Sequence, residues 1–373
     1  MAPQNRVRDI LGVPFVPPPW VSRSVVGLRR RLSAAHRRAA PPSIQLLEAL
    51  FGLFDNRVLG LLVELDVPDR LDRPRTVAEL ADATGTDRAN LERLLRYAAG
   101  RGFVRCDRRG RYRATGLTEI LRRDHPYSWR GWVEFAGSDW FWDAFRHLDA
   151  PVRGRGSGVK AATTREFFEF VNAVHPEGGD AFNRAMAAGA TVQALALNRA
   201  LDWSDVGRVC DVGGGTGATL EYLLRAHPRL EGVLFDLPGV VAAARTQLTT
   251  GEHASRCRIE GGSFFERVPA DADRYLLLAV LHDWDDAHAA RILRRLAQTM
   301  GPQSRAIVVE SILSDRPRDE FVQASDLLMC ALASGRERTA GQFDALFANS
   351  GLTRLRRIPL ATGFVAFELA PSR

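Results

Sequence analysis

The sequence contains little lysine and cysteine and no long hydrophobic run. Lys160 is the single lysine, so almost all basic residues are arginine. The four cysteines form no C-x-x-C pair and show no metal-ligand spacing with histidine, which argues against a disulfide framework and against a zinc site. No apolar run approaches the roughly 18 residues that a membrane span requires, and the N-terminus lacks a hydrophobic signal segment. We therefore expect a cytoplasmic protein with no metal site and no membrane partner.

The composition is that of a globular chain long enough for two domains. Of the 373 residues, 46% are hydrophobic and 25% are charged, a balance typical of chains that bury sizeable cores. The net charge of +7 raises the question of nucleic-acid binding. The arginines are spread through most segments, however, so we interpret the charge as a compositional bias and expect no nucleic-acid partner.

The N-terminal third carries helix and hairpin patterns that are typical of a winged-helix domain. Apolar residues recur at helical spacing over residues 43–65, and Thr76 and Glu79 stand in the positions of a capping box. A further helix is predicted over residues 88–100, and two short runs within residues 103–114 predict a hairpin around a glycine. Domains of this kind dimerise in some proteins and bind DNA in others.

A DNA-binding regulator is therefore a second hypothesis for the function. In that hypothesis the helix over residues 88–100 enters the major groove, and its polar side chains contact base edges. The acids Asp87 and Glu92 on the same segment argue against it, because they repel phosphate. The side chains available for base contacts are Arg88, Asn90, Arg93 and Arg96.

Composition and patterning divide the chain into four predicted segments. Residues 1–40, rich in proline and arginine, form an extension that packs loosely or exposes a solvated helix face. Residues 41–125 form a winged-helix-like dimerisation domain, residues 126–200 a helical substrate-pocket or linker region, and residues 201–373 a Rossmann-like domain. The third segment is dense in aromatic residues, and this density suits walls for a flat apolar substrate as well as a core.

The C-terminal part alternates apolar strands with helical segments, which predicts a doubly wound, mostly parallel sheet that ends in an antiparallel hairpin. The predicted fold class is therefore α/β, with a mainly helical domain in front. Ligands of such sheets bind beyond the carboxyl ends of the strands. The predicted strands comprise residues 209–212, 232–235, 274–281 and 305–309, a strand around Ile259, and the hairpin strands 352–358 and 364–369.

A glycine-rich motif follows the first of these strands. Residues 208–218 read Arg-Val-Cys-Asp-Val-Gly-Gly-Gly-Thr-Gly-Ala, the pattern of a strand, a tight turn and a helix N-terminus. Gly213, Gly215 and Ala218 satisfy the dinucleotide fingerprint G-x-G-x-x-G/A, and Asp236 lies at the spacing of an acid that holds a ribose. This motif alone is compatible with a dinucleotide, with another nucleoside or with no ligand.

Asp211, two positions before the first glycine, separates these alternatives. A diphosphate on the helix N-terminus would face its carboxylate, and like charges at close range repel strongly in a water-poor crevice. An ammonium group would instead be attracted. S-adenosylmethionine (SAM) has an amino-acid end, a ribose and no phosphate, so Asp211 together with Asp236 predicts SAM rather than a nicotinamide dinucleotide.

His282 is the candidate for acid-base chemistry. It follows an apolar strand at the ligand edge, and histidine titrates near neutral pH. Glu310, at the end of another strand, and Glu337, in a turn, are each placed to orient the imidazole and to stabilise its protonated form. If the cofactor donates a methyl group, a base beside a phenol assists the displacement, because a phenol with a pKa of about 10 is largely protonated at neutral pH. A satisfied core histidine is the alternative.

These motifs together resemble the SAM-dependent O-methyltransferase family that includes plant caffeate and bacterial polyketide methyltransferases. The resemblance covers nearly the whole chain from about Ile44 and rests on several motifs in a consistent order. It implies a winged-helix dimerisation region ahead of a Rossmann-like domain, and a homodimer with partly swapped N-terminal helices. The motifs are Asp211-Val-Gly-Gly-Gly-Thr-Gly, Phe235-Asp-Leu-Pro, Gly261-Gly-Ser-Phe-Phe, Leu281-His-Asp-Trp-Asp-Asp and Gly335-Arg-Glu-Arg-Thr.

The resemblance also implies roles for individual residues. The glycine turn lines the methionine part of SAM, Asp236 binds the ribose hydroxyls, and Ser263 and Phe264 flank the adenine. His282 is the proton acceptor, and two glutamates brace it. The predicted cofactor site is therefore Asp211, Gly213, Gly215, Gly217, Asp236, Ser263 and Phe264, and the predicted catalytic group is His282, Glu310 and Glu337.

Two positions depart from the family pattern. The family usually has aspartate where this chain has Ser263, and often lysine where it has Leu278. Both changes remove a charged contact near the cofactor, and some relatives from bacterial antibiotic pathways catalyse hydroxylation, decarboxylation or cyclisation instead. We therefore predict a methyltransferase that acts on a hydroxyl of an aromatic or polyketide-like molecule. Such diverted chemistry on the same fold and the DNA-binding regulator are the alternatives.

Overall fold

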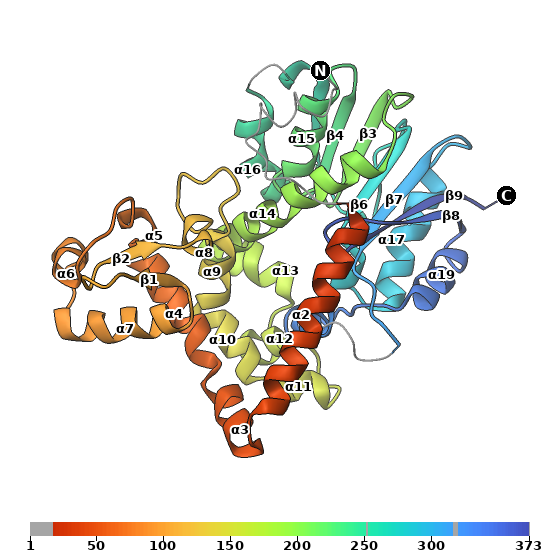
Figure 1. The fold of residues 1–373 in the computed structure, drawn as a ribbon. Helices are drawn as coiled ribbons and strands as arrows, with labels where there is room; N and C mark the ends of the chain where they lie inside the picture. The colour runs from red at the N-terminus through yellow and green to blue at the C-terminus, as the bar shows by residue number, and fades with distance from the viewer. Residues whose placement is uncertain (1–17, 251–252, 316–319, 373) are drawn as a thin grey trace. The chain divides into compact units, whose positions relative to one another are not determined.

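The computed structural model of the chain describes residues 18–250, 253–315 and 320–372 (Figure 1). Contacts within the chain separate two units. The smaller unit comprises Gly27–Trp142 and Asp180–Ala188, and the larger unit includes Asp143–Gly179 and Gly189–Arg373.

Helix α2, Pro19–Ala39, occupies most of the predicted N-terminal extension. Most of its described side chains are exposed within the single chain, and they include the apolar Trp20, Leu28 and Leu32. The solvated helix face stays a prediction. The residues before Pro18, with part of the predicted proline-rich stretch, lie outside the described residues. The predicted segment boundaries at residues 40, 125 and 200 stay predictions.

The smaller unit confirms the winged-helix pattern. Its elements are α3 (Pro42–Phe51), α4 (Leu53–Glu64), α5 (Val67–Arg70), α6 (Val77–Thr84), α7 (Arg88–Gly100), β1 (Val104–Cys106), β2 (Tyr112–Ala114), α8 (Gly116–Glu119) and α9 (Arg130–Gly137). The capping box at the start of α6 is complete, since the Glu79 N–H donates to the Thr76 hydroxyl and the Thr76 N–H donates to the Glu79 carboxylate. Asp87 caps α7 through its side chain. Strands β1 and β2 pair antiparallel, and a bridge between Arg75 and Tyr112 extends the hairpin.

The helix predicted over residues 43–65 is two helices, because Gly52 separates α3 from α4. Glycine has a low helix propensity, so a break in the helix at this position costs little free energy. None of the α3 residues is buried within the single chain. The exposed apolar side chains of α3 and the start of α4 are Ile44, Leu46, Leu47, Leu50, Phe51, Leu53 and Phe54.

Arg130 is a buried cation that ties α9 to the turn after α4. Its guanidinium, in a residue only 7% exposed, donates to Glu134 at 2.9 Å, to Asp69 at 3.0 Å, and to both Asp66 and the Val63 carbonyl at 2.7 Å. A charge in such a position is stabilising only while all of its partners are present. The residue therefore holds three carboxylates together.

The variant Arg130→Met is expected to lower the free energy of unfolding by about 2 kcal/mol, because Asp69 loses its cation and Asp66 and Glu134 keep only their pairs with Arg123 and Arg184. Urea denaturation followed by circular dichroism measures the loss. Arg96→Met is the matched control: Arg96 is 71% exposed at the side chain and pairs with Glu92 on the same helix, so its loss costs at most about 0.5 kcal/mol. Equal losses in the two variants would contradict the role given to Arg130.

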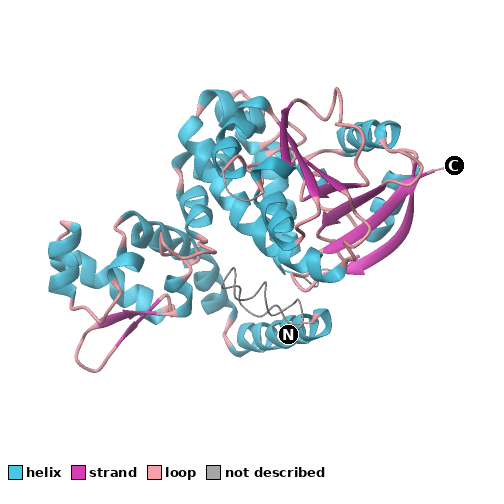
Figure 2. Cartoon of the chain, turned by 90° about the horizontal axis from the view of Figure 1, so that it is seen from above, coloured by secondary structure: helices cyan, strands magenta, loops and turns pink. Residues whose placement is uncertain are grey.

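The larger unit is built on a seven-stranded sheet with the order β5-β4-β3-β6-β7-β9-β8. The first five strands in this order run parallel, and β9 pairs antiparallel with both β7 and β8. Helices lie on both faces of the sheet (Figure 2). This arrangement confirms the predicted α/β fold with its terminal antiparallel hairpin. The strands are β3 (Arg208–Val212), β4 (Glu231–Asp236), β5 (Cys257–Gly261), β6 (Arg274–Leu278), β7 (Arg305–Glu310), β8 (Leu352–Pro359) and β9 (Val365–Pro371).

The carboxyl edge of the parallel strands is where the predicted site residues gather. Strand order reverses between β3 and β6, and such a switch point opens a ligand crevice beyond the strand ends. Strand β3 leads into the glycine turn, β4 ends at Asp236, and β7 ends at Glu310. The remaining helical elements are α10 (Asp139–Arg146), α11 (Asp149–Val152), α12 (Gly158–Thr163), α13 (Phe167–Glu169), η1 (Phe170–Val174), α14 (Pro176–Ala200), α15 (Ala218–Ala226), α16 (Pro238–Leu248), η2 (Ala254–Arg256), η3 (Leu281–Asp283), α17 (Asp286–Thr299), α18 (Glu320–Leu332) and α19 (Ala340–Ala348).

The strand predicted over residues 274–281 is too long, because β6 ends at Leu278. Ala279 has a φ of 52°, in the left-handed region, which interrupts an extended strand. The Glu310 carboxylate accepts hydrogen bonds from the two N–H groups that follow Ala279, at 3.2 and 2.7 Å. A buried acid of the neighbouring strand therefore supports the bend, and His282 lies on a short 3-10 turn beyond the strand end.

Candidate active site

The glycine turn between β3 and α15 has the backbone that its motif predicts. Gly213, Gly215 and Gly217 have φ values of 72°, 59° and 85°, a region that other residues enter only with strain. The Gly215 N–H donates to Asp236 Oδ2 at 2.7 Å. The turn is therefore joined to the end of β4, and the predicted ribose acid lies against the predicted methionine site.

Asp211 lies under this turn with an unsatisfied oxygen. The residue is 2% exposed, and its Oδ2 has no hydrogen-bond partner among the described residues. Burial, together with repulsion from Asp236, raises the pKa of the Asp211 carboxyl to about 7. A cation beside such a group lowers its pKa and compensates its charge. The site therefore fits a ligand with an ammonium group and does not fit a diphosphate.

The other predicted cofactor residues reach the same edge from the end of β5. The Gly262 N–H donates to the Asp236 carbonyl at 2.9 Å, which fixes the following residues beside β4. The Ser263 hydroxyl accepts a hydrogen bond from the Phe265 N–H at 3.3 Å. The Phe264 ring lies close to the glycine turn, since a Cβ built on Gly213 would stand 3.6 Å from it. All of the predicted cofactor residues are thus brought together.

His282 is the centre of a second polar group at this edge. Its side chain is 13% exposed, and Nδ1 lies 3.0 Å from Glu337 Oε1 and 3.9 Å from Glu310 Oε2. Because a carboxylate only accepts, this contact places the hydrogen on Nδ1. No hydrogen bond from the described residues reaches Nε2, and the Asp283 carboxylate lies 3.8 Å from it. The three predicted catalytic residues are therefore adjacent, and Nε2 is left to accept a proton.

The two glutamates differ in how their oxygens are satisfied. Glu337 accepts hydrogen bonds from His282, from Ser325 Oγ at 2.6 Å and from Ser311 Oγ at 2.5 Å. Burial works to raise the pKa of Glu337, but these donors hold it below its usual value. Glu310 is equally buried, its Oε2 has no partner among the described residues, and burial raises its pKa to about 7. Glu337 is therefore the more firmly held anion.

The acidic side chains around His282 raise its proton affinity. Burial by itself would lower the pKa of the imidazole, but the charges of Glu310, Asp283 and Glu337 outweigh burial and raise it to about 10. Burial also raises the pKa of the Asp283 carboxyl to about 6. In the ligand-free protein at neutral pH, His282 therefore carries a proton that its carboxylate neighbours stabilise.

The same three side chains offer donor atoms for a cation, since one ligand atom from each of His282, Glu310 and Glu337 lies within 4.8 Å of the other two. In the structure, however, Nδ1 donates to Glu337, and both Glu337 oxygens accept from hydroxyls. A metal requires the deprotonated nitrogen. The geometry therefore supports acid-base chemistry more directly than metal binding, and the expectation of no metal site stays a prediction.

The loop that carries His282 is clamped by the segment around Glu337. Arg338, 0% exposed, donates to the Leu281 and Trp284 carbonyls at 2.8 and 2.7 Å, and the Arg336 N–H donates to the His282 carbonyl at 2.8 Å. Sequence reasoning identifies this segment only as one of the family motifs. The roles of Arg338, Ser311 and Ser325 were missed, because residues distant in the chain become neighbours only through the sheet topology.

Gly335 permits this close passage, because a Cβ at this position would stand 2.1 Å from the His282 carbonyl oxygen and 2.5 Å from the Asp283 carbonyl carbon. Gly335→Ala is therefore expected to displace the His282 loop and to lower kcat about tenfold, since small misplacements of a catalytic group are costly. Steady-state assays measure the effect. Gly341→Ala, which adds a Cβ with no atom within 4 Å, is the control that keeps full activity. Unchanged kcat in Gly335→Ala would show that the loop position is unimportant.

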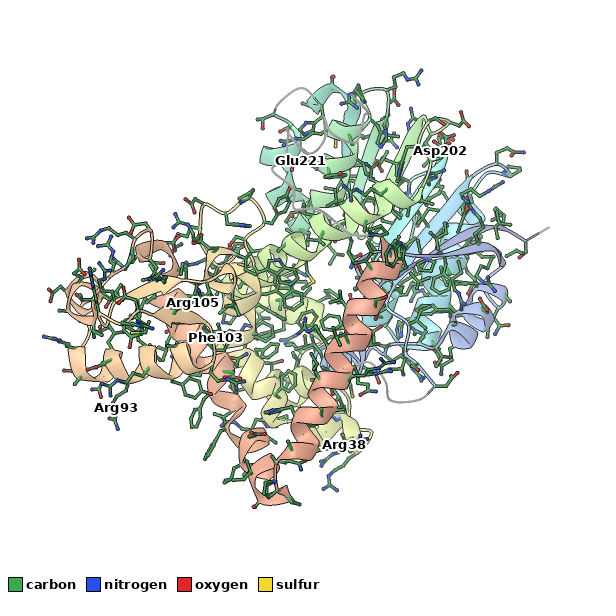
Figure 3. All side chains as sticks on the ribbon, viewed as in Figure 1. Arg38, Arg93, Phe103, Arg105, Asp202 and Glu221 are labelled. Atoms are coloured by element: carbon green, nitrogen blue, oxygen red, sulfur yellow. The ribbon has the colours of Figure 1, made fainter. Side chains whose placement is uncertain are left out.

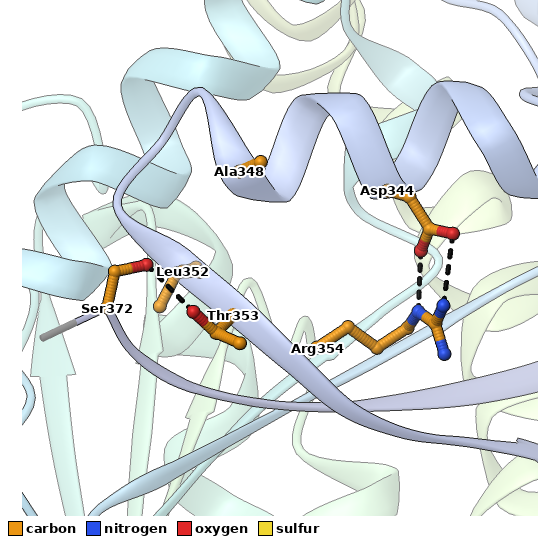
Figure 4. A pocket seen from close by; sticks show the side chains of 6 residues that line it. All are labelled: Asp344, Ala348, Leu352, Thr353, Arg354 and Ser372. Atoms are coloured by element: carbon orange, nitrogen blue, oxygen red, sulfur yellow. Dashed lines mark hydrogen bonds and ion pairs between the residues drawn. The ribbon is translucent and has the colours of Figure 1, made fainter.

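A surface cavity elsewhere on the larger unit does not share this chemistry. It has a volume of about 310 Å³ and lies between α19 and the start of β8 (Figure 4). Its polar groups satisfy one another: Arg354 pairs with Asp344 at 2.6 and 3.1 Å, and the hydroxyls of Thr353 and Ser372 lie 3.0 Å apart. The candidate active site is therefore the carboxyl edge of the parallel strands.

Comparison with known proteins decides between the functional hypotheses. Residues 145–353 match the O-methyltransferase domain, and residues 47–124 match the O-methyltransferase dimerisation domain. The chain belongs to the O-methyltransferase family. It is 35% identical to the mitomycin biosynthesis 6-O-methyltransferase of Streptomyces lavendulae over 88% of this chain and 94% of that protein.

Solved structures place this O-methyltransferase among SAM enzymes. The crystal structure of LaPhzM has a TM-score of 0.83 at 33% identity and covers 89% of this chain and 100% of its own. The O-methyltransferase NcsB1 from neocarzinostatin biosynthesis was solved with SAM and 2-hydroxy-5-methyl naphthoic acid; it has a TM-score of 0.73 at 31% identity, over 87% of this chain and 98% of its own. The protein is thus a SAM-dependent O-methyltransferase, and its dimerisation domain indicates a homodimer. The exposed apolar side chains of α3 and α4 fit a face that a second chain covers.

These comparisons do not favour the two alternatives. Figure 3 shows Arg93 on the outer side of α7, where Arg88, Asn90 and Arg96 are exposed as well. Exposed polar side chains on this helix are compatible with either a regulator or a dimerisation domain, and the domain match favours the latter. Diverted chemistry is likewise not favoured by the O-methyltransferase relatives. No helix within the described part of the chain is long and apolar enough to cross a bilayer.

Proposed function

We propose that this O-methyltransferase methylates a phenolic hydroxyl of a flat aromatic molecule, with His282 Nε2 as the proton acceptor. The observation that carries the proposal is the hydrogen bond from His282 Nδ1 to the buried Glu337 carboxylate, which leaves Nε2 as the accepting nitrogen. A cytoplasmic location is part of the proposal and is supported by the four free cysteines.

One group of residues would bind SAM, and a second group carries out the proton transfer. Asp211 and the glycine turn would hold the amino-acid end of SAM, Asp236 its ribose, and Ser263 with Phe264 its adenine. SAM supplies an electrophilic methyl group when it is bound. His282 takes the hydroxyl proton at Nε2, and Glu337 and Glu310 stabilise the imidazolium that results. Its pKa of about 10 is close to the value of about 10 that is usual for a phenol, so the proton transfer is nearly balanced.

The aromatic residues beside the His282 loop support a flat substrate. Trp284, two residues after His282, stacks on Phe168 with ring centroids 5.4 Å apart and an interplanar angle of 19°. Phe264 and Phe265 meet the same indole edge-on at 5.9 and 4.8 Å. A cluster of aromatic rings next to the ligand edge of the sheet favours planar ligands. The relative NcsB1, solved with a hydroxylated naphthoic acid, supports the same substrate class.

The proposal is tested with labelled SAM and a panel of hydroxylated bicyclic aromatic acids, with product analysis by mass spectrometry and NMR. We expect a product that carries the labelled methyl group on a former hydroxyl oxygen, and no product from the same acids when the hydroxyl is already methylated. Transfer of the label to carbon or nitrogen only would contradict the proposal.

The pH dependence provides a separate prediction. Because the His282 pKa in the free protein is raised to about 10, the base form is the minority at pH 7 and increases with pH. We expect kcat/KM to rise by about tenfold per pH unit above pH 7 until it levels off as His282 deprotonates. A profile that is flat between pH 7 and 10 would contradict the assignment of His282 as the base.

A further inference from the structure

We infer that Ser311 and Ser325 are positioning residues that fix the Glu337 carboxylate so that His282 presents Nε2 to the substrate. We call Ser311, Ser325 and Glu337 the hydroxyl clamp. The inference rests on the proposed function, because it concerns the residues that support the same base.

The clamp encloses a carboxylate that has no access to water. The Glu337 side chain is 0% exposed, and its two oxygens receive three side-chain donors. Oε1 accepts from both His282 Nδ1 at 3.0 Å and Ser325 Oγ at 2.6 Å, while Oε2 accepts from Ser311 Oγ at 2.5 Å. Hydroxyls stabilise the anion without adding a charge, so the carboxylate keeps its full attraction for the imidazole.

The contrast with Glu310 shows what the hydroxyls add. Both glutamates approach the same nitrogen of His282, and both side chains are fully buried. Glu310 receives only two backbone N–H groups on one oxygen, and its other oxygen has no partner among the described residues. The two serines therefore determine which carboxylate forms the hydrogen bond with Nδ1, and through it which nitrogen of the ring is left for the substrate.

The clamp acts on the side chain of Glu337 rather than on its backbone. The Glu337 N–H already donates to Asp326 Oδ1 at 2.8 Å, and the next residue, Arg338, is anchored to the His282 loop. These contacts do not involve either hydroxyl and remain when a serine is replaced. Loss of the hydroxyls therefore frees the carboxylate while the segment stays in place.

The other charged groups around the imidazole and around Glu337 come from four elements, and they are unchanged in the serine variants. Asp283 faces Nε2 from η3, Glu310 faces Nδ1 from β7, and Asp326 and Arg338 flank the Glu337 backbone from α18 and from the turn before α19. Any change in the titration of His282 in these variants is therefore attributable to the clamp.

The test compares Ser325→Ala, the double variant Ser311→Ala with Ser325→Ala, and Ser325→Thr, which keeps a hydroxyl. The control is Ser350→Ala. Ser350 lies in the turn after α19, outside the site; it is 2% exposed, and its hydroxyl donates to the Leu346 carbonyl at 2.7 Å. NMR of the full-length dimer with ¹³C-labelled histidine follows the titration of His282, whose signal is assigned by its loss in His282→Gln.

Without the hydroxyls the Glu337 carboxylate is free to turn away from His282 Nδ1, so the titration midpoint of His282 is expected to fall by about one pH unit in the double variant. The fall should be smaller in Ser325→Ala and absent in Ser325→Thr and in Ser350→Ala. We also expect kcat to fall about tenfold in the double variant with the dissociation constant for SAM unchanged. Ser325→Ala alone, at a half-buried helix position, keeps the test available if the double variant does not fold.

An unchanged midpoint in both alanine variants, or a fall in Ser325→Thr as large as in Ser325→Ala, would overturn the clamp. The assignment of His282 as the base is tested separately from the clamp. If His282→Ala lost turnover while the serine variants titrated like the wild type, the clamp would be wrong and the base would stand. If the midpoint moved as expected while His282→Ala kept full turnover, the clamp would stand and the base would be wrong.

Discussion

His282→Ala is expected to lower kcat for methyl transfer by about 10²- to 10⁴-fold, the usual contribution of a positioned general base. The reason is that the Asp283 and Glu310 carboxyls beside the imidazole, with pKa values of about 6 and about 7, are much weaker bases than His282, whose pKa of about 10 matches that of a phenol. Steady-state kinetics with SAM and a hydroxylated aromatic substrate measure the loss. Because His282 does not belong to the predicted cofactor site, the dissociation constant for SAM is expected to change little.

The matched control for this variant is His227→Gln. His227 also lies in the larger unit, but it follows the last residue of α15, away from the carboxyl edge of the strands. Its Nε2 lies 2.5 Å from Asn198 Oδ1. It should keep the activity of the wild type. Turnover of His282→Ala within a factor of about three of the wild type would refute general-base catalysis by this residue and leave proximity alone as the source of the rate.

Asp211→Asn is expected to weaken SAM binding by about 100-fold. The buried carboxylate with its unpartnered oxygen loses the charge that attracts the ammonium, and charge-assisted contacts of this kind contribute about 1.5–3 kcal/mol. S-adenosylhomocysteine has the same amino-acid end, so its affinity should fall by the same factor. Isothermal titration calorimetry measures both ligands without any need for turnover.

The pH dependence of binding sharpens this prediction. The pKa of Asp211 is about 7 in the free protein, and a bound cation lowers it. Binding below pH 7 should therefore release a proton, and the affinity of the wild type should fall as the pH decreases. Asp211→Asn should lose this dependence. Asp273→Asn is the control, because Asp273 caps the opposite end of β3 through the Gly207 and Arg208 N–H groups. Equal effects of the two variants would contradict the role of Asp211.

Local patterns allowed much of the fold to be predicted. The capping box of Thr76 and Glu79, the glycine turn and the alternation of strands and helices each depend on residues close together in the chain, and all three are present. The end of β6 was mispredicted because its apolar run continues to Leu281, while the bend at Ala279 depends on Glu310, a residue about thirty positions away. Sequence periodicity contains no information about that contact.

The site was predicted to the extent that its residues stand at strand ends or in recognisable motifs. His282 and Glu310 meet as expected, because the parallel order of β6 and β7 fixes which strand ends are adjacent. Glu337 reaches them from the turn before α19, where a bridge between Ile312 and Arg338 holds this turn beside the end of β7. Ser311 and Ser325 were not predicted, since a serine after a strand and a serine within a helix have no distinguishing pattern. The effect of the departures at Ser263 and Leu278 stays a prediction; at the predicted cofactor site the structure places the buried Asp211 and the half-buried Asp236.

The most direct test is a crystal structure of the dimer with S-adenosylhomocysteine and a hydroxylated aromatic substrate. We expect the amino group of the ligand beside Asp211, its ribose on Asp236, and the substrate oxygen within hydrogen-bond distance of His282 Nε2, with Nδ1 still donating to Glu337. A substrate oxygen held by another side chain, with Nε2 turned away from it, would contradict the account.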